Sequence, residues 1–271
     1  MKTIRACSFA LLPCLAFFVL ASGVFSAQGA LYSETFDNTS GANKTSGQIG
    51  WSAFVGSSAL NLTNVAGVTN TDYVAVASAA GNPGTPNGFI FANNGATANQ
   101  TFALVDTTLS SPVTLANGDS ITWTMGNNSA TATAQILIQI GGDGSVGSGS
   151  WYVSTATRTS SSLNTASFQS ASESAVTATL TFSTSMSSWK EFTLSGGNSM
   201  AVGNTLLADL SSTTITGIGF YLVDTAGVGS SMRLDTLQIV PEPGSLALVL
   251  AAGLASLLCA RRRQSRAEHV R

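Results

Sequence analysis

Cysteine, histidine and charge are scarce in this sequence. The only histidine is His269, and the three cysteines are Cys7, Cys14 and Cys259, so all four residues lie towards the ends of the chain. The long middle segment therefore contains no disulfide, no cysteine nucleophile and no histidine. These absences exclude a Ser-His-Asp relay and a histidine-ligated zinc site from that segment.

Charged residues make up only 9% of the chain. Between Leu31 and Val240 there are four basic and eleven acidic side chains, which gives this segment a net charge of −7. Such a balance repels a phosphate backbone, so we expect no nucleic-acid partner. Trp, Phe, Ile and Val recur in the segment at strand spacing, which predicts a folded domain and not a disordered chain.

The C-terminal region holds an apolar run, Leu246–Ala260, without charge or proline. As a helix it spans about 22 Å, which is less than the ~30 Å of a bilayer's hydrocarbon core. Arg261, Arg262 and Arg263 follow directly, and arginine is costly at mid-membrane. A core helix is the alternative, but a helix that is apolar all round needs partners to bury it. We predict a short transmembrane helix, followed by a cytoplasmic basic tail at 264–271.

The tripeptide Pro241-Glu242-Pro243 precedes this run, and its prolines keep the chain extended. Tripeptide, apolar run and arginine cluster together resemble the PEP-CTERM sorting signal of Gram-negative bacteria. The resemblance implies that an exosortase-like membrane transpeptidase recognises residues 241–263 and cleaves near the tripeptide. It also implies delivery of the exported part to the cell surface or extracellular matrix. The cargo domains of that family are diverse, so the resemblance leaves the activity open.

Residues 1–29 have the features of a secretory signal peptide. Lys2 and Arg5 form its basic end, Ala6–Leu20 its apolar region, and Ala27-Gln28-Gly29 a small-x-small cleavage site. An uncleaved anchor is the alternative. The exported domain is then expected at 30–240, which is long enough to bury one substantial core without disulfides.

Strand periodicity runs through the exported domain. The clearest example is the segment 175–182. Its apolar residues Val176, Ala178, Leu180 and Phe182 share one face, and its threonines share the other. Turns rich in Gly and Asn separate such runs. We expect strands near 31–36, 50–54, 73–77, 88–91, 101–105, 120–125, 133–140, 151–155, 176–182, 189–194, 217–222 and 233–239.

This pattern predicts an all-β fold, a jelly-roll β-sandwich, flanked by the signal peptide and the C-terminal transmembrane helix. The segments Tyr32–Asp37 and Arg233–Ile239 resemble the first and last strands of concanavalin-like or carbohydrate-binding jelly rolls. That resemblance is limited to the strand ends.

Calcium is the cofactor best suited to the remaining ligands, because it takes carboxylate and carbonyl oxygens. Glu34 and Asp37 in the first strand and Asp235 in the last form one candidate site, which the jelly-roll resemblance suggests. Joint ligation requires a bulge or the end of the first strand. A second candidate is the loop Asp143-Gly144-Ser145, for which a simple hairpin turn is the alternative.

Aromatic side chains are candidates for a sugar-binding platform. Trp151 and Tyr152 follow a glycine-rich loop and point to opposite faces of a strand, so one of them should be exposed. Packing in the core is the alternative for both. The other tryptophans are Trp51, Trp123 and Trp189, and the spacing of Trp123 favours the core.

Two functions fit these observations. The first is a non-enzymatic surface or matrix protein that contacts extracellular polysaccharide. The alternative is a carbohydrate-active enzyme, a glycoside hydrolase or lyase, that uses two carboxylates. No motif singles out a pair among the eleven acids of the exported domain.

Overall fold

The computed structural model describes residues 29–40, 42–56, 61–62, 72–77, 88–95, 98–106, 109, 111–127, 132–143, 145–159, 176–195, 199–225, 227 and 229–242. The predicted signal peptide up to residue 28, Pro243, the predicted helix at 246–260, the three arginines and the tail 264–271 lie outside these ranges. Residues 30–241 form one compact unit. No helix within the described ranges is long and apolar enough to cross a membrane.

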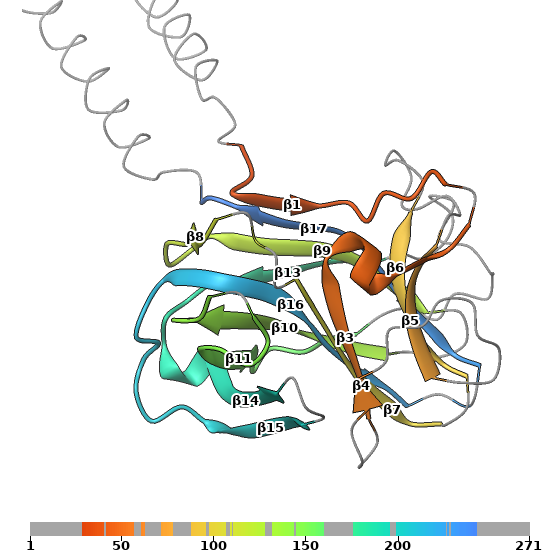
Figure 1. The fold of residues 1–271 in the computed structure, drawn as a ribbon. Coiled ribbons are helices and arrows are strands. Elements are labelled where there is room, and N and C mark those ends of the chain that lie inside the picture. The colour runs from red at the N-terminus through yellow and green to blue at the C-terminus, as the bar shows by residue number, and fades with distance from the viewer. Residues whose placement is uncertain are drawn as a thin grey trace, which may run out of the picture. The chain divides into compact units, whose positions relative to one another are not determined.

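Two antiparallel sheets make up this unit, and Figure 1 shows β1, β17, β9 and β13 lying above β16, β10, β11, β14 and β15. Sheet A contains, in spatial order, β13 (Val176–Thr181), β9 (Ser120–Asn127), β17 (Ser231–Val240), β6 (Phe89–Asn94), β5 (Asp72–Ala77) and β2 (Lys44–Thr45), with β1 (Tyr32–Glu34) on β17. Sheet B contains β15 (Ser199–Thr205), β14 (Trp189–Ser195), β11 (Ser150–Ser154), β10 (Ala132–Ile140), β16 (Thr214–Asp224), β7 (Gln100–Asp106), β3 (Trp51–Gly56) and β4 (Asn61–Leu62). Two short strands pair outside this order, β12 (Arg158–Thr159) with β10 and β8 (Val113–Thr114) with β16.

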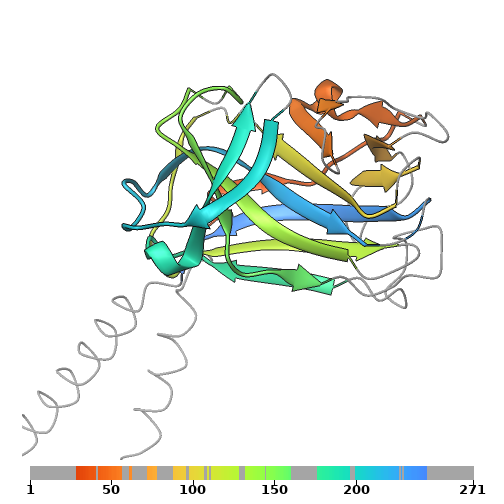
Figure 2. The same cartoon turned by 90° about the horizontal axis from the view of Figure 1, so that it is seen from below.

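Successive strands cross between the sheets, as from β6 to β7, from β9 to β10 and from β16 to β17. The described residues contain only two short 3-10 helices, η1 (Ser46–Ile49) and η2 (Met186–Ser188). The expected all-β sandwich is therefore confirmed, and the crossings fit a jelly roll. Figure 2 shows the sandwich from below, with sheet B towards the viewer.

Each of the twelve expected strands overlaps an observed one. The sequence did not predict the two-residue strands β2, β4, β8 and β12, nor the seven-residue strand β15. Two residues are too short to show an alternation. In β15, residues 201–205 are all exposed, so a regular apolar face is missing from this strand.

The main core lies between the sheets and is built around a row of aromatic rings. Phe36 meets Trp51 edge to face with ring centroids 5.0 Å apart, and Phe220 lies 6.2 Å from Trp51 and 5.9 Å from Trp123. All four side chains are buried. The expectation that Trp123 belongs to the core is confirmed.

Sheet B carries a second apolar cluster, on its other face. Its buried members include Phe54, Leu137, Trp151, Phe192 and Leu194. Because adjacent residues of a strand point to opposite faces, Leu137 joins this cluster while its neighbours in β10 join the main core. Both faces of sheet B are therefore apolar at β10, and the second cluster extends over one face of β11 and β14.

Candidate functional site

The loop between β10 and β11 is held by side-chain hydrogen bonds. The buried Gln139 amide donates to the carbonyl oxygens of Ser145 and Ser148, both at 2.7 Å. The carboxylate of Asp143 accepts hydrogen bonds from Ser148 Oγ and from the Ser145 N–H, the latter at 2.9 Å. The hydrogen bonds of Ser148, followed by those of Ser145, lower the pKa of Asp143 to about 2. Asp143 thus organises a hairpin connection, the alternative considered for this loop.

This loop positions Trp151 at the start of β11. The indole N–H of Trp151 donates to the Val146 carbonyl oxygen at 3.2 Å, and the ring is only 4% exposed. A Cβ atom at Gly217 in β16 would lie 2.9 Å from Trp151 Cη2, so the glycine leaves room for the ring. Trp151 is therefore a packed support and not an exposed platform.

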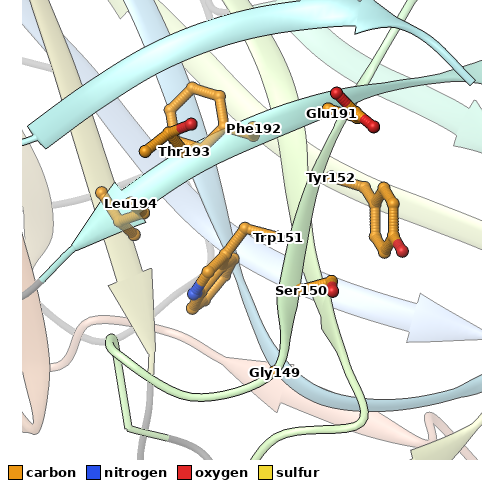
Figure 3. Close-up of a pocket in the computed structure, with 8 residues that line it drawn as sticks. All are labelled: Gly149, Ser150, Trp151, Tyr152, Glu191, Phe192, Thr193 and Leu194. Carbon is orange, nitrogen blue, oxygen red and sulfur yellow. The ribbon is translucent and has the colours of Figure 1, made fainter.

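A pocket of about 350 Å³ lies along β11 and β14. Figure 3 shows the eight residues that line it: Gly149, Ser150, Trp151, Tyr152, Glu191, Phe192, Thr193 and Leu194. Its volume is at the lower end of the roughly 300–1,000 Å³ of ligand pockets. Both aromatic residues predicted from the sequence thus lie at one pocket.

Strand pairing determines which side chains face each other at the pocket. Trp151 is paired with Phe192 and Tyr152 with Glu191 in the antiparallel register. Trp151 and Phe192 are buried in the second apolar cluster, whereas Tyr152 is half-buried and Glu191 exposed. Figure 3 shows Trp151 and Tyr152 leaving β11 in opposite directions, with Glu191 on the side of Tyr152.

The polar residues of the pocket were not predicted as site residues. Ser150, Glu191 and Thr193 are exposed and line it with Tyr152. Glu191 lies 39 positions after Tyr152 in the chain, and only the pairing of β14 with β11 brings the two together. The alternation within residues 189–194 shows which residues share a face, but not which strand lies beside them.

A second polar cluster connects the two sheets at β1. The Tyr32 hydroxyl, from sheet A, donates a hydrogen bond to Asp106 Oδ2 at the end of β7 in sheet B, at 2.8 Å. Glu34 Oε1 accepts a hydrogen bond from the Phe36 N–H at 2.7 Å. Burial raises the pKa of Glu34; the Phe36 N–H opposes this effect, and the Asp106 carboxylate adds to it.

The three predicted calcium ligands are not gathered at one place. Glu34 is paired with Leu237, whose side chain lies in the main core. Asp235 follows the core residue Leu234 and so points away from that core, where its Oδ1 accepts from the Thr236 N–H at 2.7 Å. Asp37 is exposed. A register shift between Asp235 and Gln238 separates the two halves of β17.

Among the residues that the structure describes, no three His, Cys, Asp or Glu side chains form a group that could hold a metal ion. The calcium site stays a prediction.

From the raised pKa of Glu34 we predict how the stability of the folded protein depends on pH. Folding favours the protonated form of this carboxyl, so its stabilising contribution is complete below the unfolded-state pKa and is lost as the pH rises through the folded-state pKa. Glu34→Gln resembles the protonated form and keeps an acceptor for the Phe36 N–H. We expect it to raise the melting temperature at about pH 7 and to leave it nearly unchanged at about pH 3.5. Thermal unfolding at both pH values checks this, and an equal shift at both would contradict it.

Only the first two residues of the predicted sorting tripeptide, Pro241 and Glu242, lie in the described ranges. They follow directly after β17, which ends at Val240, and Glu242 is exposed.

No model of a known protein family matches this chain, and no curated protein sequence is similar to it. Solved structures with a similar fold include three carbohydrate-binding proteins. A family 11 carbohydrate-binding module from Clostridium thermocellum, in complex with a beta-1,3-1,4-mixed-linked tetrasaccharide, is 14% identical, with 79% of this chain and 98% of that chain covered and a TM-score of 0.41. TmCBM61 in complex with beta-1,4-galactotriose is 12% identical, with 77% and 99% covered and a TM-score of 0.31. The CBM22-1 xylan-binding domain of Xyn10C from Paenibacillus barcinonensis is 12% identical, with 80% and 98% covered and a TM-score of 0.32. These values are too low to assign the chain to any of the three families.

Proposed function

We propose that the exported β-sandwich binds an extracellular polysaccharide at the pocket along β11 and β14. The observation that carries this proposal is the pairing of Tyr152 with Glu191 on the wall of that pocket. The Tyr152 ring packs partly against the main core. Its exposed part offers a surface for the apolar face of a sugar, and neighbouring hydroxyl and carboxylate groups bind the sugar hydroxyls. Ser150 and Thr193 supply further hydroxyls in the same lining.

The same pocket favours binding over hydrolysis. Glycoside hydrolysis uses two carboxyl groups about 5–9.5 Å apart on either side of the scissile bond. Glu191 is the one acidic side chain among the residues that line the pocket. Asp106 and Glu34 are near each other, but Asp106 is only 7% exposed and has little access to a substrate. We therefore propose a non-enzymatic role.

Removal of the Tyr152 ring tests the binding function. Tyr152→Ala is expected to weaken binding of the best polysaccharide ligand of the unit 30–241 by about tenfold, which corresponds to about 1.4 kcal/mol. Tyr152→Phe keeps the ring and is the matched control, with a much smaller effect. Titration calorimetry against a panel of soluble polysaccharides measures the affinities.

Unchanged affinity in the Tyr152→Ala protein would contradict binding at this pocket. Release of reducing sugar by the purified protein, abolished by one carboxylate substitution, would instead favour the enzymatic alternative.

We further propose that the chain is exported by its signal peptide, held transiently by its C-terminal helix and transferred to the cell surface or matrix by an exosortase-like enzyme. The order of tripeptide, apolar run and arginine cluster supports this route. The exposed position of Glu242 just beyond β17 supports access to the tripeptide.

Substitution of the tripeptide tests the sorting route in a cell that has an exosortase. Replacing Glu242 by alanine, or both Pro241 and Pro243, is expected to leave most of the protein in the membrane with its tail attached. Fractionation and mass spectrometry of the C-terminus measure the outcome. Normal surface delivery with tail removal would contradict sorting through the tripeptide.

A further inference from the structure

Glu191 is the only charged side chain among the residues that line the pocket. It is exposed, and within the part of the chain that the structure describes its carboxylate makes no hydrogen bond or ion pair. Lys190 is its neighbour in β14, but adjacent residues of a strand point to opposite faces. The carboxylate is therefore available to a ligand in the pocket.

The strand that lies beside Glu191 is irregular. In the pairing of β14 with β15, Lys190 is opposite Thr205 and Phe192 is opposite Val202. Two residues of β15, Gly203 and Asn204, thus occupy the space opposite Glu191 alone, which is the arrangement of a β-bulge. Bulges often redirect a side chain at a functional site.

Gly203 provides the space that the Glu191 side chain occupies. A Cβ atom at position 203 would lie 3.0 Å from Glu191 Cβ and 3.5 Å from its carboxylate oxygen Oε2. The first distance is tighter than ordinary van der Waals contact, so a side chain at this position would push Glu191 aside by a few tenths of an ångström. Glu191 and Tyr152 are paired across β14 and β11, so their side chains stand on the same face of sheet B.

The arrangement distinguishes between classes of sugar. A uronic acid or sulfated sugar would be repelled by Glu191 and by the net charge of −7 between Leu31 and Val240. A neutral sugar offers only hydroxyl groups to the carboxylate. An ammonium group forms a charge-assisted hydrogen bond, which is about twice as strong, and it is also attracted to the face of an aromatic ring such as that of Tyr152.

We infer that the pocket selects an amino sugar, a hexosamine whose free amine is protonated and paired with Glu191 while its ring lies on Tyr152. This inference rests on the proposed polysaccharide binding and names the class of sugar bound at the same site. The ligand is thus a polysaccharide that contains de-N-acetylated hexosamine.

The experiment compares two oligosaccharides of equal length, one of glucosamine and one of N-acetylglucosamine, with the purified unit 30–241, which has its own core. Titration calorimetry at low salt is expected to give about tenfold tighter binding of the glucosamine oligomer. Added salt and a pH above the pKa of the sugar amine should both reduce this ratio.

Two variants test the assignment to Glu191. Glu191→Gln is expected to bring the affinity ratio close to one, and Gly203→Ala to lower it by displacing the carboxylate. Asp209→Asn removes the same charge at an exposed position outside the pocket lining, and it should leave the ratio at its wild-type value.

Equal affinity of the wild-type protein for the two oligomers would overturn the inference, as would a ratio that persists in Glu191→Gln. If binding is equal for both oligomers but still sensitive to Tyr152→Ala, the proposed function stands and only the amino-sugar inference fails. If neither these oligomers nor any polysaccharide of the panel binds, both fail.

Discussion

The Phe220→Ala protein is expected to lose about 3–5 kcal/mol of its free energy of unfolding. Phe220 is fully buried and lies between the rings of Trp51 and Trp123, which belong to opposite sheets. Loss of its ring leaves a cavity at the centre of the sandwich, because the two tryptophans are held by their own strands. Urea denaturation followed by tryptophan fluorescence measures the change.

The control for Phe220→Ala is Thr177→Ala, which changes an exposed residue of β13 and should alter the stability by about 0.5 kcal/mol or less. A loss below about 1 kcal/mol in Phe220→Ala would mean that the site collapses around the cavity and that the aromatic row is not a rigid core.

Gly219→Ala is expected to destabilise the protein by about 3 kcal/mol, at the upper end of the range for overpacking. A Cβ atom at Gly219 would lie 2.0 Å from the Leu104 carbonyl oxygen and 2.7 Å from Val105 Cα. These are backbone atoms of β7, the strand that pairs with β16 at this position. The two strands must therefore separate in the middle of sheet B, where no side-chain movement relieves the clash.

Gly227→Ala is the matched control, because a Cβ atom at Gly227 would meet nothing within 4 Å. Thermal unfolding of the two variants compares them directly. Similar melting temperatures for both would show that the clash at Gly219 is relieved by a small adjustment of the backbone.

The alternation of apolar residues predicted the strands because one face of each lies in a core. In β10, for example, Ile136, Ile138 and Ile140 all point into the main core. The same rule indicated that Trp151 and Tyr152 point to opposite faces, and their different exposure agrees with it. Neither inference needs knowledge of the neighbouring strands.

The candidate site could not be predicted in the same way, because it depends on pairing between distant segments. Glu191 belongs to the pocket only because β14 pairs with β11 in one register, and the strand on its other side has a bulge at Gly203 and Asn204. For the calcium prediction, Glu34 is paired with the core residue Leu237, and Asp235 points away from that core. Local sequence patterns contain no signal for register or for such irregularities.

The position of β17 has a mechanical consequence. β17 is hydrogen-bonded to β6 at Ser231–Leu234 and to β1 at Leu237–Ile239. It is also hydrogen-bonded to β9 on both sides of its register shift. A tensile load entering at Val240 runs along this strand, whereas its ladder hydrogen bonds lie perpendicular to it. These bonds are then loaded in shear and must break together, while a strand pulled away sideways would lose them one at a time. A protein held at its C-terminal end and bound to a polysaccharide through sheet B would therefore resist unfolding under force better than one whose last strand is pulled away sideways.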